Sequence, residues 1–461
     1  MSNIASPSLQ IKTDINEILK ADATRQDAAF FVTPVGFDAT ATVQPPRLAA
    51  VILDISVSMK GAKIQAAVEG ACAFLDAMLK SPQNYVAVYL FGSSKHRLFH
   101  PALATPQNIE AAKHALRQKL PALEGSTQTA GGLQLFREDY CALAKAGKVT
   151  EGFAGLLTDG DYGDRVSVGE ELVAYQGLAK QGQILRVLAR GVGTDWEMDK
   201  LRLISDGTGS APPVVLANPS EVKADFEGMV AQAASQALSG VTMVIQKFNM
   251  GDILDIAVRS PVSLDLENAC SKEGEKFIRV NLGSWDAETR LFYLAFEVAR
   301  PSNAPAVMAA KIWFEYKVGG QLVKSDPFPI KAQWARNSEE ASLSQRVTRG
   351  VKVAQGIEGS QRRMREAGDL LKGGNTRGAS DILGDLVKTA HEDGDIDLLE
   401  QLKEFVEILD AATGKVKLKN TDAATGMKIN AGSSVRRTRA VAAPTAAPAD
   451  TTAAAATTTQ S

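Results

Sequence analysis

Between residues 47 and 238, apolar runs of strand length alternate with longer stretches in which apolar positions recur every three or four residues. The run RLAAVILD at 47–54 is followed by AKIQAAVEGACAFLDAML, in which Ile64, Val68 and Leu75 fall on one helical face. Three later runs are apolar in the same way: NYVAVYLFG, EGFAGLLTDG and ILRVLARGVG. Strands that are apolar throughout and separated by helices are typical of a parallel sheet covered on both faces. The pattern predicts a doubly wound, mostly parallel α/β domain over residues 47–238.

The pattern changes after residue 238, where the helical period disappears. Short alternating runs separated by turn residues follow, among them VTMVIQKF, TRLFYLAFEVA and AVMAAKIWFEYKV. Such alternation predicts an antiparallel β-sandwich over residues 239–335. The stretch AAFFVTPVGFDATATV at 28–43 alternates as well, so we expect the N-terminal segment 1–46 to add an edge strand to this sandwich. The α/β domain would then be an insertion into the sandwich.

Two further segments follow the sandwich. Residues 336–411 return to a helical period interrupted by glycine pairs, and we expect two or three packed helices there. Residues 412–461 have few apolar positions: Lys415 to Arg439 contains seven Lys or Arg and the single acid Asp422, and the remainder is rich in Ala, Thr and Pro. This composition predicts a disordered tail. We expect its basic stretch to be a solvated linker, with contact to an acidic partner as the alternative.

The composition, 45% apolar and 23% charged, is that of a globular protein, and the formal net charge of −2 provides no general attraction to nucleic acid or to an anionic membrane. No apolar run approaches the roughly 20 residues needed to cross a bilayer. The N-terminal sequence MSNIASPSLQIKTD lacks the basic start and apolar core of a secretory signal, and the three cysteines form no CxxC pair. We therefore expect a cytoplasmic protein that neither binds nucleic acid nor inserts into a membrane.

Oxygen-bearing side chains follow three separate elements of the predicted α/β domain. Asp54, Ser56 and Ser58 come directly after the first strand, Thr127 stands in a glycine-flanked loop before a helix, and Asp159 follows another strand. In a doubly wound sheet, ligands bind in the crevice outside the carboxyl ends of the strands. Two carboxylates and three hydroxyls, with no His or Cys, suit Mg²⁺ or Mn²⁺. The sequence therefore predicts a metal site at this edge, exposed to solvent and outside the core.

This set of residues resembles the metal-ion-dependent adhesion site of the von Willebrand factor A (vWA) domain. The family pattern is Asp-x-Ser-x-Ser, a distant Thr, and a distant Asp in a Thr-Asp-Gly turn, and the likeness extends over about residues 47–235. Val57 stands where many members have glycine. The resemblance implies a Rossmann-like fold and a bound Mg²⁺, with Mn²⁺ or Ca²⁺ as alternatives, and an acidic side chain of a protein partner that completes the metal shell. The metal ligands that it implies are Asp54, Ser56, Ser58, Thr127 and Asp159.

Two more carboxylates lie close to this site in the sequence. Asp161 and Asp164 belong to the stretch TDGDYGD, directly after the Thr-Asp-Gly turn. They are candidates for the rim of the partner-binding surface. A solvated acidic turn is the alternative interpretation.

The resemblance implies a protein-binding scaffold or assembly factor inside a bacterial cell. Intracellular bacterial members of the family are often associated with AAA+ ATPases or with stress-response systems, which makes such proteins the expected partners. An extracellular adhesin with the same site is an alternative, and a metal-dependent hydrolase is a second. The chain has no G-x-S-x-G elbow, no H-E-x-x-H motif and no phosphate-binding loop, so we expect that it is not an enzyme.

Overall fold

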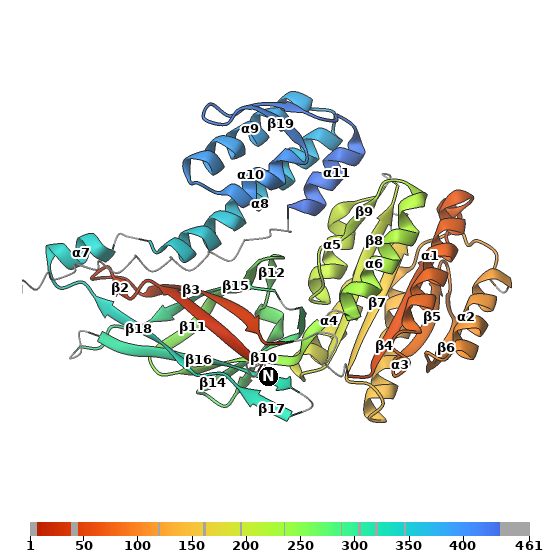
Figure 1. Cartoon of the computed structure of the whole chain (residues 1–461), viewed down its shortest axis with the longest axis horizontal. Coiled ribbons are helices and arrows are strands. Elements are labelled where there is room, and N and C mark those ends of the chain that lie inside the picture. The colour runs from red at the N-terminus through yellow and green to blue at the C-terminus, as the bar shows by residue number, and fades with distance from the viewer. Residues whose placement is uncertain are drawn as a thin grey trace, which may run out of the picture.

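Three bodies are visible in the computed structural model of the chain: an α/β domain, a β-sandwich and a helical domain (Figure 1). The structure describes residues 7–37, 45–118, 120–159, 163–193, 196–234, 236–286, 288–302, 306–318, 321–344 and 347–433. Among the helices within these ranges, none is long and apolar enough to span a membrane.

The α/β domain is built on one six-stranded sheet, as the sequence predicts. All neighbouring strands are parallel except the edge pair β5 and β6, which is antiparallel. The strands, in their order across the sheet, are β6 (Lys95–Leu103), β5 (Tyr85–Phe91), β4 (Arg47–Asp54), β7 (Glu151–Thr158), β8 (Ile184–Val192) and β9 (Val214–Leu216). The predicted doubly wound, mostly parallel fold is confirmed.

Helices cover both faces of this sheet, and an apolar core lies on each face. One face carries α1 (Ala62–Met78), α2 (Pro106–Gln118) and α6 (Val222–Ala234); the other carries α3 (Thr129–Lys145), α4 (Arg165–Lys180) and α5 (Met198–Gly207). Along β4, Ile52 belongs to one core, and its neighbours Val51 and Leu53 belong to the other. Each strand residue is therefore buried, whichever way it points, which explains the uninterrupted apolar run.

The β-sandwich consists of two sheets and includes the N-terminal residues. One sheet has the order β1 (Ser8–Ile15), β3 (Arg25–Val35), β15 (Arg290–Val298), β11 (Met250–Ser260) and β12 (Leu264–Asp265). The other has the order β13 (Cys270–Glu273), β14 (Phe277–Asp286), β10 (Gln236–Lys247), β16 (Ala306–Val318), β18 (Phe328–Trp334) and β2 (Ile18–Leu19), and β17 (Gln321–Lys324) pairs with β16. The α/β domain is thus inserted between β3 and β10.

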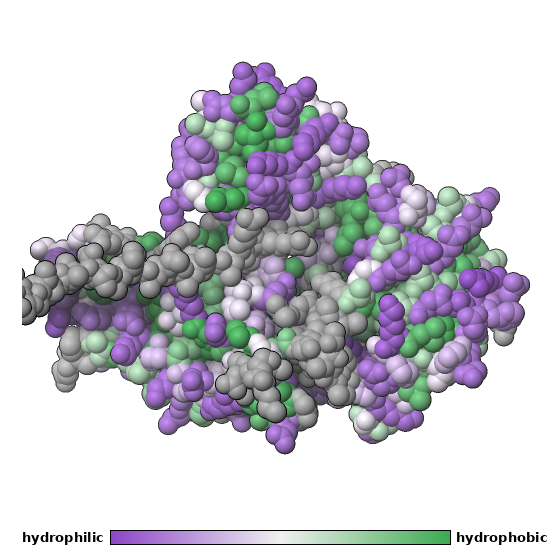
Figure 2. All heavy atoms as spheres, viewed as in Figure 1, coloured by the Kyte–Doolittle hydropathy of each residue, from purple (hydrophilic) through white to green (hydrophobic). Residues whose placement is uncertain are grey.

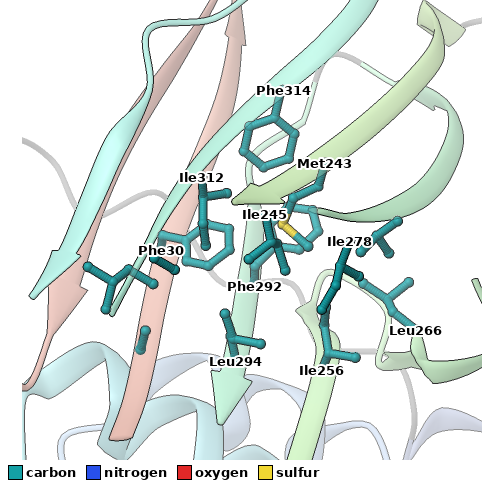
Figure 3. Close-up of a cluster of buried hydrophobic side chains, with 14 of the residues drawn as sticks. Phe30, Met243, Ile245, Ile256, Leu266, Ile278, Phe292, Leu294, Ile312 and Phe314 are labelled. Atoms are coloured by element: carbon teal, nitrogen blue, oxygen red, sulfur yellow. The ribbon is translucent and has the colours of Figure 1, made fainter. Parts of the chain in front are cut away.

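The N-terminal strand β3 is not at the edge of its sheet, because β1 pairs with its outer side and β15 with its inner side. Strand β1 was not predicted, because its residues are mostly polar and half-buried or exposed. Figure 3 shows the side chain of Phe30, from β3, among core residues from both sheets. Its ring stacks on Phe292 at 5.3 Å between centroids, and Phe292 lies 5.7 Å from Phe314 of the opposite sheet. The N-terminal segment is therefore an integral part of the sandwich core.

The helical domain continues further along the chain than the sequence predicts. It contains α7 (Ser338–Ser344), α8 (Arg349–Lys372), α9 (Thr376–Glu392), α10 (Ile396–Lys403), the hairpin β19 (Val406–Asp410) and β20 (Lys415–Leu418), and α11 (Ala423–Gly432). The prediction of a disordered tail from residue 412 is wrong as far as Ser433, and residues 434–461 lie outside the described ranges.

Three features of α11 explain this error. Asp422, the single acid of the basic stretch, caps the helix by accepting a hydrogen bond from Thr425 N at 2.7 Å. Gly426 lies against Gly368 of α8, where an added Cβ would come within 2.6 Å of a backbone oxygen. Met427 is 1% exposed and belongs to the apolar core that α5 and β8 also line. Two small residues and one apolar anchor suffice to dock the helix, and composition does not reveal them.

Helix α8 connects the helical domain to the sandwich. Its first turn is held by Asp14 of β1, whose Oδ2 accepts a hydrogen bond from Gly350 N at 2.6 Å. Val351, Ala354 and Ile357 pack against the outer face of β3 and β15. Because α11 docks on the α/β domain, the helical domain contacts both of the other bodies. On the face seen in Figure 2, hydrophilic side chains cover most of this domain around a narrower apolar strip.

Candidate metal centre

The segment between β4 and α1 carries three of the candidate ligands on a tight turn. Asp54 ends β4, and its Oδ1 accepts a hydrogen bond from Ser56 N at 2.7 Å. Ser58 lies in the short 3-10 helix η1 (Val57–Met59). Gly61 follows with φ 86°, a left-handed conformation that glycine adopts without strain and that redirects the chain into α1. The turn therefore returns the chain over the end of the sheet.

A continuous chain of hydrogen bonds joins four of the five candidate ligands. Ser56 Oγ lies 2.8 Å from Ser58 Oγ, and Ser58 Oγ donates to Asp159 Oδ1 at 2.7 Å. Asp159 follows β7, which pairs in parallel with β4. The carboxyl ends of the two neighbouring strands therefore meet, and the structure brings Asp54, Ser56, Ser58 and Asp159 together.

Thr127, the fifth candidate, lies at the same edge of the sheet. The loop that carries it is tied to the first segment by Val57 N, which donates to Glu124 O at 2.8 Å, and by Glu124 N, which donates to Ile55 O at 2.8 Å. On its other side, Gln128 N donates to Gly92 O at 2.9 Å. Thr127 is half-buried, and no hydrogen bond joins it to the other four candidates in the described part of the chain. Its position fits the predicted role, although its side chain is not part of the hydrogen-bonded chain.

Of the two candidate rim residues, the structure describes one. Asp161 lies outside the described residues. Asp164, directly before α4, is half-buried, and its Oδ2 accepts a hydrogen bond from Ala130 N in the first turn of α3 at 2.9 Å. Asp164 therefore links the first turns of α3 and α4, a structural contact that the sequence does not indicate. Its role in partner binding stays a prediction.

Two residues that the sequence analysis did not assign to the site contact its carboxylates. Thr158 Oγ1 donates a hydrogen bond to Asp54 Oδ2. Lys63, in the first turn of α1, forms an ion pair with Asp159 Oδ2. Thr158 belongs to the Thr-Asp-Gly turn, so the motif itself could have suggested its contact. For Lys63 the signal was its place in the first turn of the helix that begins at the site, which does not indicate that its side chain reaches Asp159.

The site is more buried than the sequence predicts. Asp54 is 0% exposed, Ser56 3% and Asp159 2%, so the expectation of a solvent-exposed edge is wrong for these three. Burial raises the pKa of Asp54, and the hydrogen bonds from Thr158 and Ser56 oppose this rise. In the described part of the site, two carboxylates are buried, and the ammonium group of Lys63 pairs with that of Asp159. Buried carboxylates are costly unless cations or hydrogen bonds compensate them, so this excess of negative charge favours a further cation.

The donor set fits a hard divalent cation. Two carboxylates and three hydroxyls supply oxygen ligands, which Mg²⁺ prefers, and a count of five leaves one position of an octahedron for a water or an outside ligand. The described residues contain no group of three or more His, Cys, Asp and Glu side chains that could hold a metal. The candidate centre therefore depends on its hydroxyl groups, which distinguishes it from a typical zinc site.

Comparisons with known proteins support the fold. No family model matches the chain, and no curated protein matches it. Among solved structures, the von Willebrand factor type A protein from Catenulispora acidiphila is similar with a TM-score of 0.74 and 22% identity, over 95% of this chain and 99% of that chain. The ArnB paralog VWA2 from Sulfolobus acidocaldarius is similar with a TM-score of 0.52 and 15% identity, over 94% of this chain and 100% of that chain. The chain thus has the fold of vWA proteins over nearly its whole length.

Proposed function

We propose that this protein is a metal-dependent protein-binding module, which captures an acidic side chain of a partner at a divalent cation. The observation that carries the proposal is the hydrogen-bonded chain from Asp54 through Ser56 and Ser58 to Asp159, at the carboxyl edge of a sheet with the vWA fold. Mg²⁺ is the cation that we propose, with Mn²⁺ or Ca²⁺ as alternatives. The ligands are Asp54, Ser56, Ser58, Thr127 and Asp159.

The residues of the candidate centre have separate roles in this proposal. Asp54 and Asp159 supply negative charge, and the hydroxyl groups supply neutral oxygen atoms. Thr158 Oγ1 and Ser56 N hold the two oxygens of Asp54 in place. When bound, the cation supplies an electrophilic centre that attracts an outside carboxylate. Because only two of the five ligands carry charge, that attraction remains available to a partner.

Val57 adds an apolar contact beside the candidate ligands. Its side chain is 52% exposed, although the flanking Ile55 and Met59 are fully buried. An exposed apolar side chain between two ligand serines favours a partner whose acidic residue stands next to an apolar one. Val57 therefore contributes to the choice of partner and not to metal binding.

We propose a binding role inside the cell and not an enzymatic one. The sandwich and the helical domain would then position the metal-bearing edge, as parts of a scaffold or assembly factor. An AAA+ ATPase or a protein of a stress-response system is the candidate partner, in keeping with the intracellular proteins that this sequence resembles.

Titration calorimetry with Mg²⁺ and Mn²⁺ tests the metal centre directly. The expected result is saturable binding by the unaltered protein and none by Asp54→Asn. Pull-down from native lysate, with and without EDTA, then tests partner capture. Partners that remain bound in EDTA would contradict the proposal, and Asp76→Asn, which alters an exposed carboxylate at the far end of α1, provides the control.

A further inference from the structure

An open pocket of about 620 Å³ lies between the α/β domain and the helical domain. Helix α5 contributes Asp199 and Arg202 to its lining, and α11 contributes Asn430. Helix α8, which lies above α5 in Figure 1, contributes Arg362 and Arg365. Three guanidinium groups from two domains therefore line one cavity, which we call the arginine pocket.

These arginines differ from Arg363 of α8, which has a carboxylate partner. Within the described ranges, no ion pair is found for Arg202, Arg362 or Arg365, whereas Arg363, on another side of α8, pairs with Asp385 at 3.0 Å. Arg202 Nη2 donates to the backbone oxygen of Asn430 at 2.9 Å. Its Nε is buried and has no hydrogen-bond partner in the described structure. The protein therefore uses only part of the hydrogen-bonding capacity of this guanidinium group, and the absence of ion pairs at all three arginines favours a ligand that accepts hydrogen bonds.

The lining also contains three carboxylates, those of Asp199, Glu366 and Asp369, and none of them forms an ion pair with the arginines in the described structure. Asp369 accepts a hydrogen bond from Asn430 Nδ2 at 2.5 Å. The pKa of Arg202 is lowered, by burial first and by the like charge of Arg365 next. Three carboxylates, those of Asp206, Asp199 and Asp369, oppose this lowering of the pKa, each with a smaller effect than that of Arg365. The strongest charged neighbour of Arg202 is therefore another cation.

We propose that the arginine pocket binds an oxyanion of the phosphate class, held between Arg202 of the α/β domain and Arg365 of the helical domain. Guanidinium groups are planar and present paired N–H donors, which match the oxygen atoms of a phosphate group. Such an anion would relieve the repulsion between the like charges of Arg202 and Arg365. Because its two main contacts come from different domains, it also fastens the helical domain to the α/β domain. This site is independent of the proposed metal centre.

Titration calorimetry of the full chain with inorganic phosphate tests the proposal, in EDTA and at constant ionic strength with chloride as the balancing salt. The unaltered protein is expected to bind one phosphate, and Arg365→Gln is expected to bind at least about tenfold more weakly, because a charged hydrogen-bonding group is lost. Arg363→Gln is the matched control. It removes the same charge from α8, two residues before Arg365 and outside the pocket lining, and should bind phosphate normally. Glycerol 3-phosphate serves as a second probe: tighter binding than inorganic phosphate would identify an organic phosphate as the source of the anion.

Melting curves give an independent measurement, since a ligand that binds only the folded protein raises the melting temperature. Phosphate should raise it for the unaltered protein and for Arg363→Gln, and not for Arg365→Gln. Arg365 is half-buried and forms no ion pair in the described structure, so its replacement should leave the fold intact. The proposal is overturned if neither probe binds saturably, or if Arg365→Gln and Arg363→Gln weaken binding equally.

Discussion

The candidate metal centre and the arginine pocket differ in their charged groups and in their construction. At the metal centre, two carboxylates from neighbouring strands are buried within one domain, and Asp159 pairs with Lys63. At the arginine pocket, Arg202 and Arg365 come from two domains and have no carboxylate partner in the described structure. The first site is fixed by the pairing of β4 with β7, and the second exists only where α5 meets α8. We therefore expect changes within one domain to affect the first site, and changes in domain docking to affect the second.

The largest expected effect is that of Asp54→Asn on metal binding. The amide keeps an oxygen acceptor for Ser56 N or Thr158, and removes one of two charges, so metal affinity should fall at least about 100-fold. Calorimetry with Mn²⁺ measures this loss, and circular dichroism checks the fold. Phosphate binding should not change. Metal affinity close to that of the unaltered protein would contradict the assignment of Asp54 as a ligand.

Asp54→Ala should also lower stability, because the site is buried. The substitution removes the acceptor of the hydrogen bonds from Ser56 N and Thr158 Oγ1, and the loss at the buried amide of Ser56 costs about 1–3 kcal/mol. Denaturant unfolding measures this cost. If Asp54→Ala and Asp54→Asn have the same free energy of unfolding, the hydrogen bond that the amide keeps does not contribute to stability.

Met427→Ala should affect the arginine pocket and leave the candidate metal centre nearly unchanged. Met427 anchors α11 in the core of the α/β domain, so its truncation should destabilise the protein by about 2–5 kcal/mol and loosen the domain contact at the arginine pocket. Phosphate affinity should therefore fall, while Mn²⁺ affinity stays within about twofold. Leu322→Ala, at an exposed position on β17, is a control for truncation of an apolar side chain. Loss of metal binding in Met427→Ala would show that the metal centre also depends on docking.

Lys63→Met should have a smaller effect on metal affinity than Asp54→Asn. The ammonium group of Lys63 and a divalent cation both interact with Asp159, so removal of this charge should raise Mn²⁺ affinity about tenfold. In EDTA the melting temperature should fall, because Asp159 is buried and loses its ion pair. Lys60→Met, which removes an exposed charge from the same segment, is the matched control. Weaker metal binding by Lys63→Met would show that Lys63 positions Asp159 and does not compete with the cation.

The sequence predicts that the residues of the candidate metal centre lie together because sheet topology brings them to one edge. Asp54 and Asp159 each follow an apolar strand, and the carboxyl ends of parallel strands lie at one edge. The contact of Lys63 with Asp159 could not be predicted, because it depends on the reach of a long side chain and not on a repeating pattern. The arginine pocket has no sequence signal, since Arg202 and Arg365 are neighbours only after α11 docks. For α11 itself, composition was misleading because the close approach at Gly426 and the burial of Met427 depend on their places in the fold and not on hydropathy.

The smallest expected effect is that of removing residues 434–461. The Ala, Thr and Pro content of this segment predicts that it has little to bury, so truncation after Ser433 should change the melting temperature by less than about 1 °C. Ser433 must be kept, because it is 1% exposed and its Oγ donates to Asn430 O at 2.7 Å. A chain that ends at Thr421 loses α11 as well, and should melt several degrees lower and lose phosphate binding.

This truncation also separates two possible sources of phosphate binding. The removed segment contains Arg436, Arg437 and Arg439, whose charges could attract phosphate without any pocket. If the arginine pocket is the site, the chain that ends at Ser433 binds phosphate with unchanged affinity, and Arg365→Gln weakens binding in this shorter chain as much as in the full one. If binding disappears with the three C-terminal arginines, the guanidinium groups between α5 and α8 are not the phosphate site. The contrast between a site within one domain and a site between two domains then no longer holds.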